Sequence, residues 1–196
     1  MVPREQSDVK ERILDAALTA FSEHGYDGAT IRQIAEHSST NVALVSYHFG
    51  GKEQLFFEMF ERNFPRFEPW SDGGNPVEAL RGIVDQMIRF KAEHSCLANI
   101  MHHEAGMSTC RMQGLSGYAQ PLWDRVKGCL QAGAEGRVFK FERIEIALFC
   151  VMSVLLMPKE LTVCPDSKSN TNGCIDHVIY STSTFLLQGL GYLPEA

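Results

Sequence analysis

The sequence has 196 residues, of which 44% are hydrophobic and 21% are charged, with 18 basic against 24 acidic side chains. This length and apolar content predict one or two globular units with a buried core and exclude a disordered chain. The net charge is −6, and residues 1–64 carry six basic and ten acidic side chains. A broad positive surface for binding nucleic acid is therefore excluded, so any DNA contact must rest on a few placed donors.

The sequence also limits where the protein is expected to act. No apolar run reaches the roughly 20 residues of a membrane-spanning helix, and the first eight residues lack the hydrophobic stretch of a secretory signal. We expect a cytoplasmic protein that does not enter the membrane. The six cysteines, at positions 96, 110, 129, 150, 164 and 174, form no C-x-x-C pair, so we expect reduced thiols that behave as small apolar side chains rather than a disulfide framework.

Two helices are predicted before residue 38. Asp8-x-x-Glu11 is typical of a capping box, and apolar residues recur at helical spacing over residues 9–24 until Gly25 ends the helix. A second box, Thr30-x-x-Gln33, opens a helix of about two turns.

Two further helices follow the short polar stretch 38–40. Asn41 is a typical cap for a third short helix, which Gly50-Gly51 ends. Its buried side is predicted to comprise Leu44, Val45 and Phe49. A fourth helix starts at Lys52 and stops at Pro65.

The remaining chain is predicted to be helical as well. Residues 65–76, with three prolines and two glycines, are predicted to link a domain of residues 1–64 to one of residues 77–196. Asn75-Pro76 is a cap followed by a first-turn proline. Further helices are expected near 95–106, 118–132, 142–157 and 173–189, with a polar loop at 158–172. The segment 144–156 is apolar nearly all round, so one of its sides is expected to be covered by a second copy of the chain.

The two short helices are the most informative part of the pattern. Two short helices joined by a tight turn, with one supporting helix before and one after, are the layout of a helix-turn-helix DNA-binding motif. Residues 30–36 are predicted to form its positioning helix and residues 41–49 the helix that enters the major groove.

Residues 9–64 resemble the DNA-binding domain of TetR-family transcriptional regulators. The resemblance rests on Thr30–Ala35 and on Val45–Leu55, which carries that family's aromatic-His-Phe and Lys-Glu-x-Leu signature. It implies an all-α protein, with an N-terminal three-helix helix-turn-helix domain and a C-terminal helical domain that binds a ligand and dimerises. The implied function is that of a ligand-responsive regulator, a repressor by default, which binds a palindromic operator in double-stranded DNA as a homodimer.

The resemblance also implies which residues contact DNA. Tyr47, His48 and Lys52 are expected at phosphates, with the start of the fourth helix contributing its dipole. Six residues are expected at base edges or the adjacent backbone: Arg32, Thr40, Asn41, Val42, Ala43 and Ser46. Ser39 stands where the family's turn usually has glycine, and Thr40 where a hydrophobic residue is usual.

The C-terminal half has no signature that matches residue by residue. Residues that could line a cavity for an unknown small-molecule effector, or form plain core, are Met87, Phe90, Met101, Trp123, Phe149 and Met152. Two copies of the chain are expected to pair through 142–157 and 173–189. The residues predicted at that interface are Leu148, Val151, Leu155, Val178, Phe185 and Leu186.

Two alternatives remain at this stage, a metal-sensing regulator and a protein-responsive one. Metal-ligating residue types gather in one region, at His94, Cys96, His102, His103, Glu104 and Cys110. Neighbouring His102 and His103 diverge by about 100° on a helix, which argues against a shared site, and we expect no metal. The sequence has no catalytic triad, phosphate-binding glycine loop or paired carboxylate motif, so we expect neither an enzyme nor a cofactor.

Overall fold

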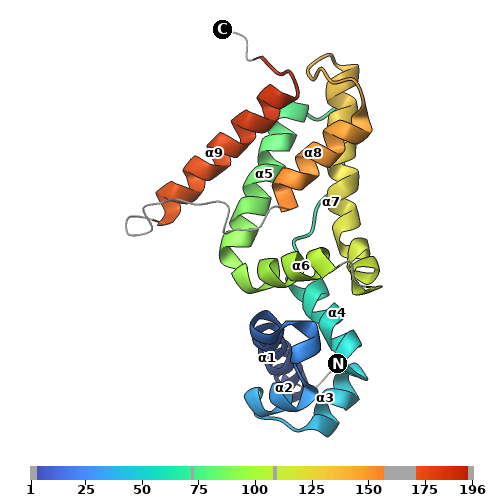
Figure 1. The fold of residues 1–196 in the computed structure, drawn as a ribbon, viewed down its shortest axis with the longest axis vertical. Coiled ribbons are helices and arrows are strands. Elements are labelled where there is room, and N and C mark those ends of the chain that lie inside the picture. Colours follow the sequence, from blue (N-terminus) through green and yellow to red (C-terminus); the bar gives the residue numbers. More distant parts are fainter. Residues whose placement is uncertain (1–3, 72, 108–109, 157–170, 194–196) are drawn as a thin grey trace. The chain divides into compact units, whose positions relative to one another are not determined.

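The computed structural model describes residues 4–71, 73–107, 110–156 and 171–193. Within these ranges every regular element is an α-helix, which confirms the all-α prediction (Figure 1). Most of the polar loop predicted at 158–172 lies outside the described residues. None of the described helices combines the length and apolarity needed to cross a membrane.

The chain forms two compact units, each built from two stretches of sequence. The first unit combines residues 1–64 with 96–118, and the second combines 65–95 with 119–196. Residues 96–118 thus group with the N-terminal helices, although the sequence pattern alone assigns them to the second half. The sequence does not indicate this grouping. Residues 65–76 are marked as a boundary by their prolines and glycines, and no comparable stretch precedes residue 96.

The N-terminal part of the first unit consists of α1 (Arg4–Gly28), α2 (Ile31–His37), α3 (Val42–Phe49) and α4 (Lys52–Asn63). Helix α1 packs against α2 and α4, and α3 packs against α2 and α4. The helical path of α1 is broken at Gly25, whose φ of 67° and ψ of 174° lie outside the helical region and favour glycine. The predicted stop at Gly25 is therefore seen as a kink, after which the chain makes one more short turn.

Aromatic packing and ion pairs join α1 to α4. The Phe56 ring lies edge-on to Phe21, with centroids 5.1 Å apart, and 4.9 Å from the Phe60 ring. Lys10 pairs with Glu58 at 2.6 Å. The Arg62 guanidinium donates to the carboxylates of Glu11 and Asp15, at 2.8 and 2.6 Å. Two of the six basic side chains of residues 1–64 are thus used to hold this unit together.

The turn between α2 and α3 is closed by backbone hydrogen bonds. The Thr40 N–H donates to the Ala35 carbonyl at 2.9 Å, and the Ser39 N–H donates to the Glu36 carbonyl at 3.2 Å. These two bonds form a Schellman motif, whose left-handed position is usually glycine. Ser39 occupies it here with a φ of 53°. The structure thus places a serine in the conformation for which glycine is favoured, as the comparison with the family pattern predicts.

The second unit contains α5 (Pro76–Glu93), α8 (Ile144–Leu156) and α9 (Thr171–Gly189). It also contains the larger part of α7 (Cys110–Glu135). The first turns of α7 and most of α6 (Ser95–Met107) belong to the first unit. Helix α5 packs against α8 and α9. Arg89 of α5 pairs with Asp176 of α9 at 2.7 Å. Asn75 caps α5 by accepting from the Val77 N–H at 2.9 Å, which confirms the predicted cap.

The start of α7 differs from the prediction. The helix begins at Cys110, whereas the sequence predicts a start near residue 118. Two glycines and Pro121 lie in its first half and weaken the local helix signal. The helix forms here in spite of this low local propensity.

The stretch between α4 and α5 is packed against α7 within the second unit. Arg125 donates to the Glu68 carbonyl at 2.7 Å, and the Cys129 thiol donates to the Pro76 carbonyl at 3.1 Å. A Cβ built on Gly128 would lie 2.6 Å from Trp70 Cβ, so glycine permits this close approach. Burial raises the pKa of the Cys129 thiol to about 12, which suits a purely structural cysteine.

The prediction of reduced cysteines holds at three of the positions that the structure describes and is wrong at a fourth. Cys96, Cys129 and Cys150 are free. Cys174, in α9, is disulfide-bonded, contrary to the expectation of reduced thiols throughout. The spacing of cysteines along a sequence does not reveal which of them the fold brings together.

We predict that Ser39→Gly stabilises the free protein. Removing the Cβ from a left-handed position relieves about 1 kcal/mol after the greater freedom of an unfolded glycine is allowed for, which raises the Tm by about 2–4 °C in a chain of this size. Thermal unfolding followed by circular dichroism measures the shift. Ser46→Gly, at a helical position of α3, is the matched control and should lower the Tm. An unchanged or lower Tm for Ser39→Gly would contradict the assigned strain.

Candidate DNA-binding surface

Helix α3 is fixed at both of its ends. At its start, the Asn41 side-chain oxygen accepts a hydrogen bond from the Leu44 N–H at 2.9 Å. At its end, Gly50 has a φ of 73° and its N–H donates to the Ser46 carbonyl at 2.8 Å. Both the predicted cap and the predicted stop are confirmed. These two caps define a rod of eight residues, Val42–Phe49.

The rod is anchored by a narrow apolar face. Val45 and Phe49, one helical turn apart, are buried. Leu44 is 37% exposed, so the prediction that it is buried is wrong. Its position is offset by about 100° from Val45, and the two anchors suffice to hold so short a helix. The outer face of α3 is consequently more apolar than the sequence indicates.

Most of the residues predicted to face bases lie on this outer face. Tyr47, which is predicted to contact a phosphate, also projects from this face, with 75% of its surface exposed. The other exposed positions at the start and on the outside of α3 are Asn41, Val42, Ala43 and Ser46. Exposed Val42, Leu44 and Tyr47 in so short a segment form an apolar patch of the kind that marks a contact surface.

Arg32 projects from the start of α2. The capping box of that helix is confirmed, because the Gln33 N–H donates to the Thr30 hydroxyl at 3.2 Å while the Thr30 N–H donates to the Gln33 side chain at 2.9 Å. The Arg32 side chain is 84% exposed and pairs with Glu36 at 3.0 Å. Such an exposed pair contributes little to stability, so Arg32 can exchange Glu36 for another acceptor.

Three predicted contact residues are half-buried. The Thr40 hydroxyl forms a hydrogen bond with the hydroxyl of buried Ser38 at 2.8 Å, which ties it to the turn. His48 lies edge-on to Tyr47, with ring centroids 5.3 Å apart. The Lys52 ammonium lies 4.5 Å from the centroid of the Tyr26 ring. These contacts fix the three side chains around the ends of α3.

The residues predicted to bind an effector fall into different environments. Met87, Phe90 and Met152 are buried in the second unit, and Trp123 of that unit is half-buried. Met101, also half-buried, belongs to the first unit. Phe149, in contrast, is 67% exposed, so these six side chains do not all line one enclosed space.

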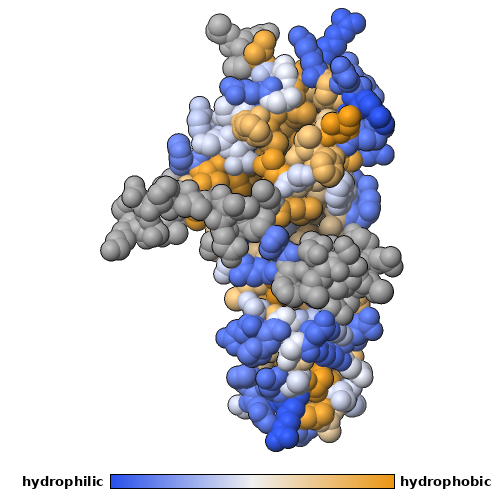
Figure 2. All heavy atoms as spheres, viewed as in Figure 1, coloured by the Kyte–Doolittle hydropathy of each residue, from blue (hydrophilic) through white to orange (hydrophobic). Residues whose placement is uncertain are grey.

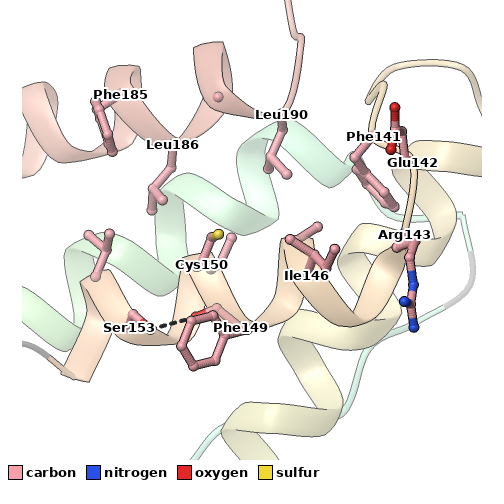
Figure 3. A pocket seen from close by; sticks show the side chains of 14 residues that line it. Phe141, Glu142, Arg143, Ile146, Phe149, Cys150, Ser153, Phe185, Leu186 and Leu190 are labelled. Atoms are coloured by element: carbon pink, nitrogen blue, oxygen red, sulfur yellow. Dashed lines mark hydrogen bonds between the residues drawn. The ribbon is translucent and has the colours of Figure 1, made fainter.

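Three of the six predicted dimer residues, Val151, Phe185 and Leu186, line a groove between α8 and α9. Val151, Leu155 and Leu186 are buried within one chain, Leu148 and Val178 are half-buried, and Phe185 is 67% exposed. Figure 3 shows Phe185 of α9, and Leu190 directly after that helix, across from Ile146 and Phe149 of α8, along a groove of about 620 Å³. Hydrophobic side chains gather on this face of the second unit (Figure 2). One side of the apolar helix α8 is therefore left uncovered by the residues that the structure describes.

The cluster of metal-ligating residue types does not form a metal site in the part of the chain that the structure describes. There, no three His, Cys, Asp or Glu side chains are placed to hold one ion. His94, Cys96 and His102 are exposed, whereas Glu104 is buried. The side chains of His103 and Cys110 lie outside the described set.

Comparison with known proteins agrees with this arrangement. Residues 13–59, which run from α1 through most of α4, match the family model described as bacterial regulatory proteins, tetR family. Residues 13–59 therefore form a domain of the tetR family. Regulators of this family are typically DNA-binding proteins rather than enzymes.

Individual TetR-family relatives match over different lengths. The HTH-type transcriptional repressor AcnR of Corynebacterium efficiens is 32% identical over 81 residues, which are 41% of this chain and 43% of AcnR. The chain thus matches less than half the length of that repressor. The crystal structure of HlyIIR, a hemolysin II transcriptional regulator, shares 27% identity over 90% of this chain and 97% of that one, with a TM-score of 0.69.

A more distant structure shares the TetR fold alone. AibR, solved in complex with isovaleryl coenzyme A and operator DNA, is 19% identical. It covers 88% of this chain and 97% of its own, with a TM-score of 0.70. The fold seen here is thus one that, in AibR, holds both an acyl-coenzyme A and DNA.

We predict that Asn41→Ala destabilises the free protein, because the Leu44 N–H loses its acceptor at the start of α3. Loss of such a cap costs about 1 kcal/mol. Thermal or urea unfolding in the absence of DNA measures this cost separately from any DNA contact of Asn41. Asn41→Ser retains a capping oxygen and is the control; equal losses for both variants would show that the cap is not what holds α3.

Proposed function

We propose that this protein is a ligand-responsive transcriptional repressor that binds a palindromic operator as a homodimer. The observation that carries the proposal is the exposed outer face of α3, held between its two caps and backed by buried Val45 and Phe49. A short rigid helix presented in this way fits the major groove of B-DNA.

The exposed side chains suggest how an operator is read. Arg32 can offer two parallel donors to a guanine, and Val42 and Ala43 can contact a thymine methyl group. Leu44, exposed beside them, adds a further apolar contact. Tyr47, His48 and Lys52 are proposed to contact phosphates, and Thr40 and Asn41 the backbone next to the bases, with Ser46 near a base edge.

Pairing of two chains is supported by the groove between α8 and α9. Phe149 and Phe185 expose apolar area there that a symmetric partner would bury. In such a dimer the two recognition helices would lie about 34–36 Å apart, one turn of DNA. A palindromic site follows from that symmetry.

The effector is proposed to bind in the second unit, whose helices contribute Met87, Phe90, Trp123 and Met152. An effector that binds more tightly to a state with altered spacing of the recognition helices lowers operator affinity by the coupling energy, typically about 1–3 kcal/mol. The AibR complex supports this reading, because that protein of the same fold was solved with both a small molecule and operator DNA. The identity of its ligand is not carried over to this chain.

We predict that Arg32→Ala weakens binding to the preferred DNA site about 5- to 150-fold, the range that corresponds to about 1–3 kcal/mol for a bidentate base contact. The site is first selected from a pool of random duplexes with the wild-type protein. Fluorescence anisotropy then measures the affinity of each variant for the selected duplex.

Arg81→Ala is the matched control, because Arg81 also forms an exposed pair with a glutamate of its own helix, Glu78, but lies in the second unit. It should bind as the wild type does. Failure of the wild type to enrich any sequence from the pool would overturn the proposed function, and equal effects of the two substitutions would remove Arg32 from the interface.

We predict that Phe149→Glu separates the dimer, because it places a charge on the apolar groove that the partner covers. Sedimentation velocity should give twice the 21.9 kDa chain mass for the wild type and one chain mass for the variant. Tyr47→Glu, the same kind of change at another exposed aromatic side chain, should remain dimeric while losing DNA binding. A variant Phe149→Glu that stays dimeric would place the interface elsewhere.

A further inference from the structure

Lys52 is the first residue of α4, and its side chain is directed back to the end of α1. Its ammonium lies 4.5 Å from the Tyr26 ring centroid and 3.5 Å from the Asp27 carbonyl oxygen. The first distance is within the range of a cation–π interaction, and the second is at the long limit of a hydrogen bond. Two consecutive residues of α1 thus hold the cation that is proposed to meet a phosphate.

The Tyr26 ring is itself held between two aromatic side chains. It stacks on Phe21, with centroids 5.7 Å apart and planes 13° apart, and it lies edge-on to Phe56 at 5.1 Å. Phe21 and Phe56 are buried. The ring is therefore a fixed support, built on the core of the first unit, and not a mobile surface side chain.

The kink at Gly25 brings Tyr26 to this position. With a φ of 67° and a ψ of 174°, Gly25 leaves the helical path immediately before Tyr26. That left-handed φ favours glycine, since a side chain there would be strained. The Tyr26 ring reaches both Phe21, five residues before it, and Lys52, at the start of α4.

We propose that Tyr26 is a positioning residue for DNA binding, which orients the Lys52 ammonium before a phosphate arrives. The inference rests on the proposed function. A lysine that is already ordered loses less conformational freedom on binding than one that is free to rotate.

A double-mutant cycle tests the inference. The four proteins are the wild type, Tyr26→Leu, Lys52→Met and the double variant. The probes are a 30-base-pair duplex selected by the wild type and an unrelated duplex of the same length, because a phosphate contact is independent of sequence. Fluorescence anisotropy at several NaCl concentrations gives the affinity and the salt dependence of each protein.

We expect Tyr26→Leu to weaken binding of both duplexes about 2- to 10-fold, because a long lysine side chain that is no longer held in place must be ordered on binding. Lys52→Met should weaken both and reduce the slope of log affinity against log salt by about one ion. In the Lys52→Met background, Tyr26→Leu should have no further effect. Tyr26→Phe retains the ring and should bind as the wild type does.

Equal effects of Tyr26→Leu in both backgrounds would overturn the inference and assign Tyr26 a purely structural role. If Tyr26→Leu does not fold, pentafluorophenylalanine at position 26 keeps the ring's shape but removes its negative face. It should then weaken binding only in the protein that retains Lys52.

Phe57→Leu, a nearby change in α4, is the packing control and should leave the effect of Lys52→Met unchanged. A wild-type protein that binds neither duplex would sink the proposed function itself, whereas additive effects would sink only this inference.

Discussion

The orientation of α3 depends on the closed turn that precedes it. Because the Thr40 N–H reaches back to the Ala35 carbonyl, the chain leaves α2 in one direction only. Ser38 reinforces this geometry, since its buried hydroxyl donates to the Ile34 carbonyl at 2.8 Å. The direction of α3 in turn decides which of its side chains are buried and which face outward. The operator contacts proposed for the side chains of α3 follow from that one turn.

The electrostatics of the first unit follow from how few cations it has. Lys10 and Arg62 hold α1 against α4, and Lys52 lies on Tyr26. Arg32 is paired with Glu36, on the exposed side of its own helix. An acidic domain that uses its basic side chains in this way gains little from general attraction to DNA. The affinity for DNA that we propose must therefore come from shape and from the placement of individual donors.

The features that could be predicted from the sequence are local ones. The caps at Thr30, Asn41 and Asn75 depend on residues two or three positions apart, and each is found where the pattern predicts it. The outer face of α3 follows from the same short range, with the exception of Leu44. Whether Leu44 is buried depends on how much of α3 is covered by the helices packed against it. The spacing of apolar residues along the sequence does not determine that coverage.

The features that could not be predicted depend on tertiary contacts. The early start of α7 is one, because two glycines and a proline conceal the helix in the sequence. The contact between Lys52 and Tyr26 is another, since it joins residues 26 positions apart through a kink at Gly25. The disulfide at Cys174 belongs to the same class.

The composition of the first unit limits how this protein can be divided into parts. Ile100 and Glu104 of α6 line a cavity of about 320 Å³ together with Phe21 and Tyr26 of α1. Gly114 of α7 lies close to the Phe57 ring, because a Cβ added to this glycine would lie 2.5 Å from the ring. A chimaera that joins residues 1–64 to the effector domain of another regulator would strip away these partners and leave apolar surface of α1 and α4 open to water. The smallest part that could be moved to another protein with its contacts intact therefore consists of two separate stretches of sequence, residues 1–64 and 96–118.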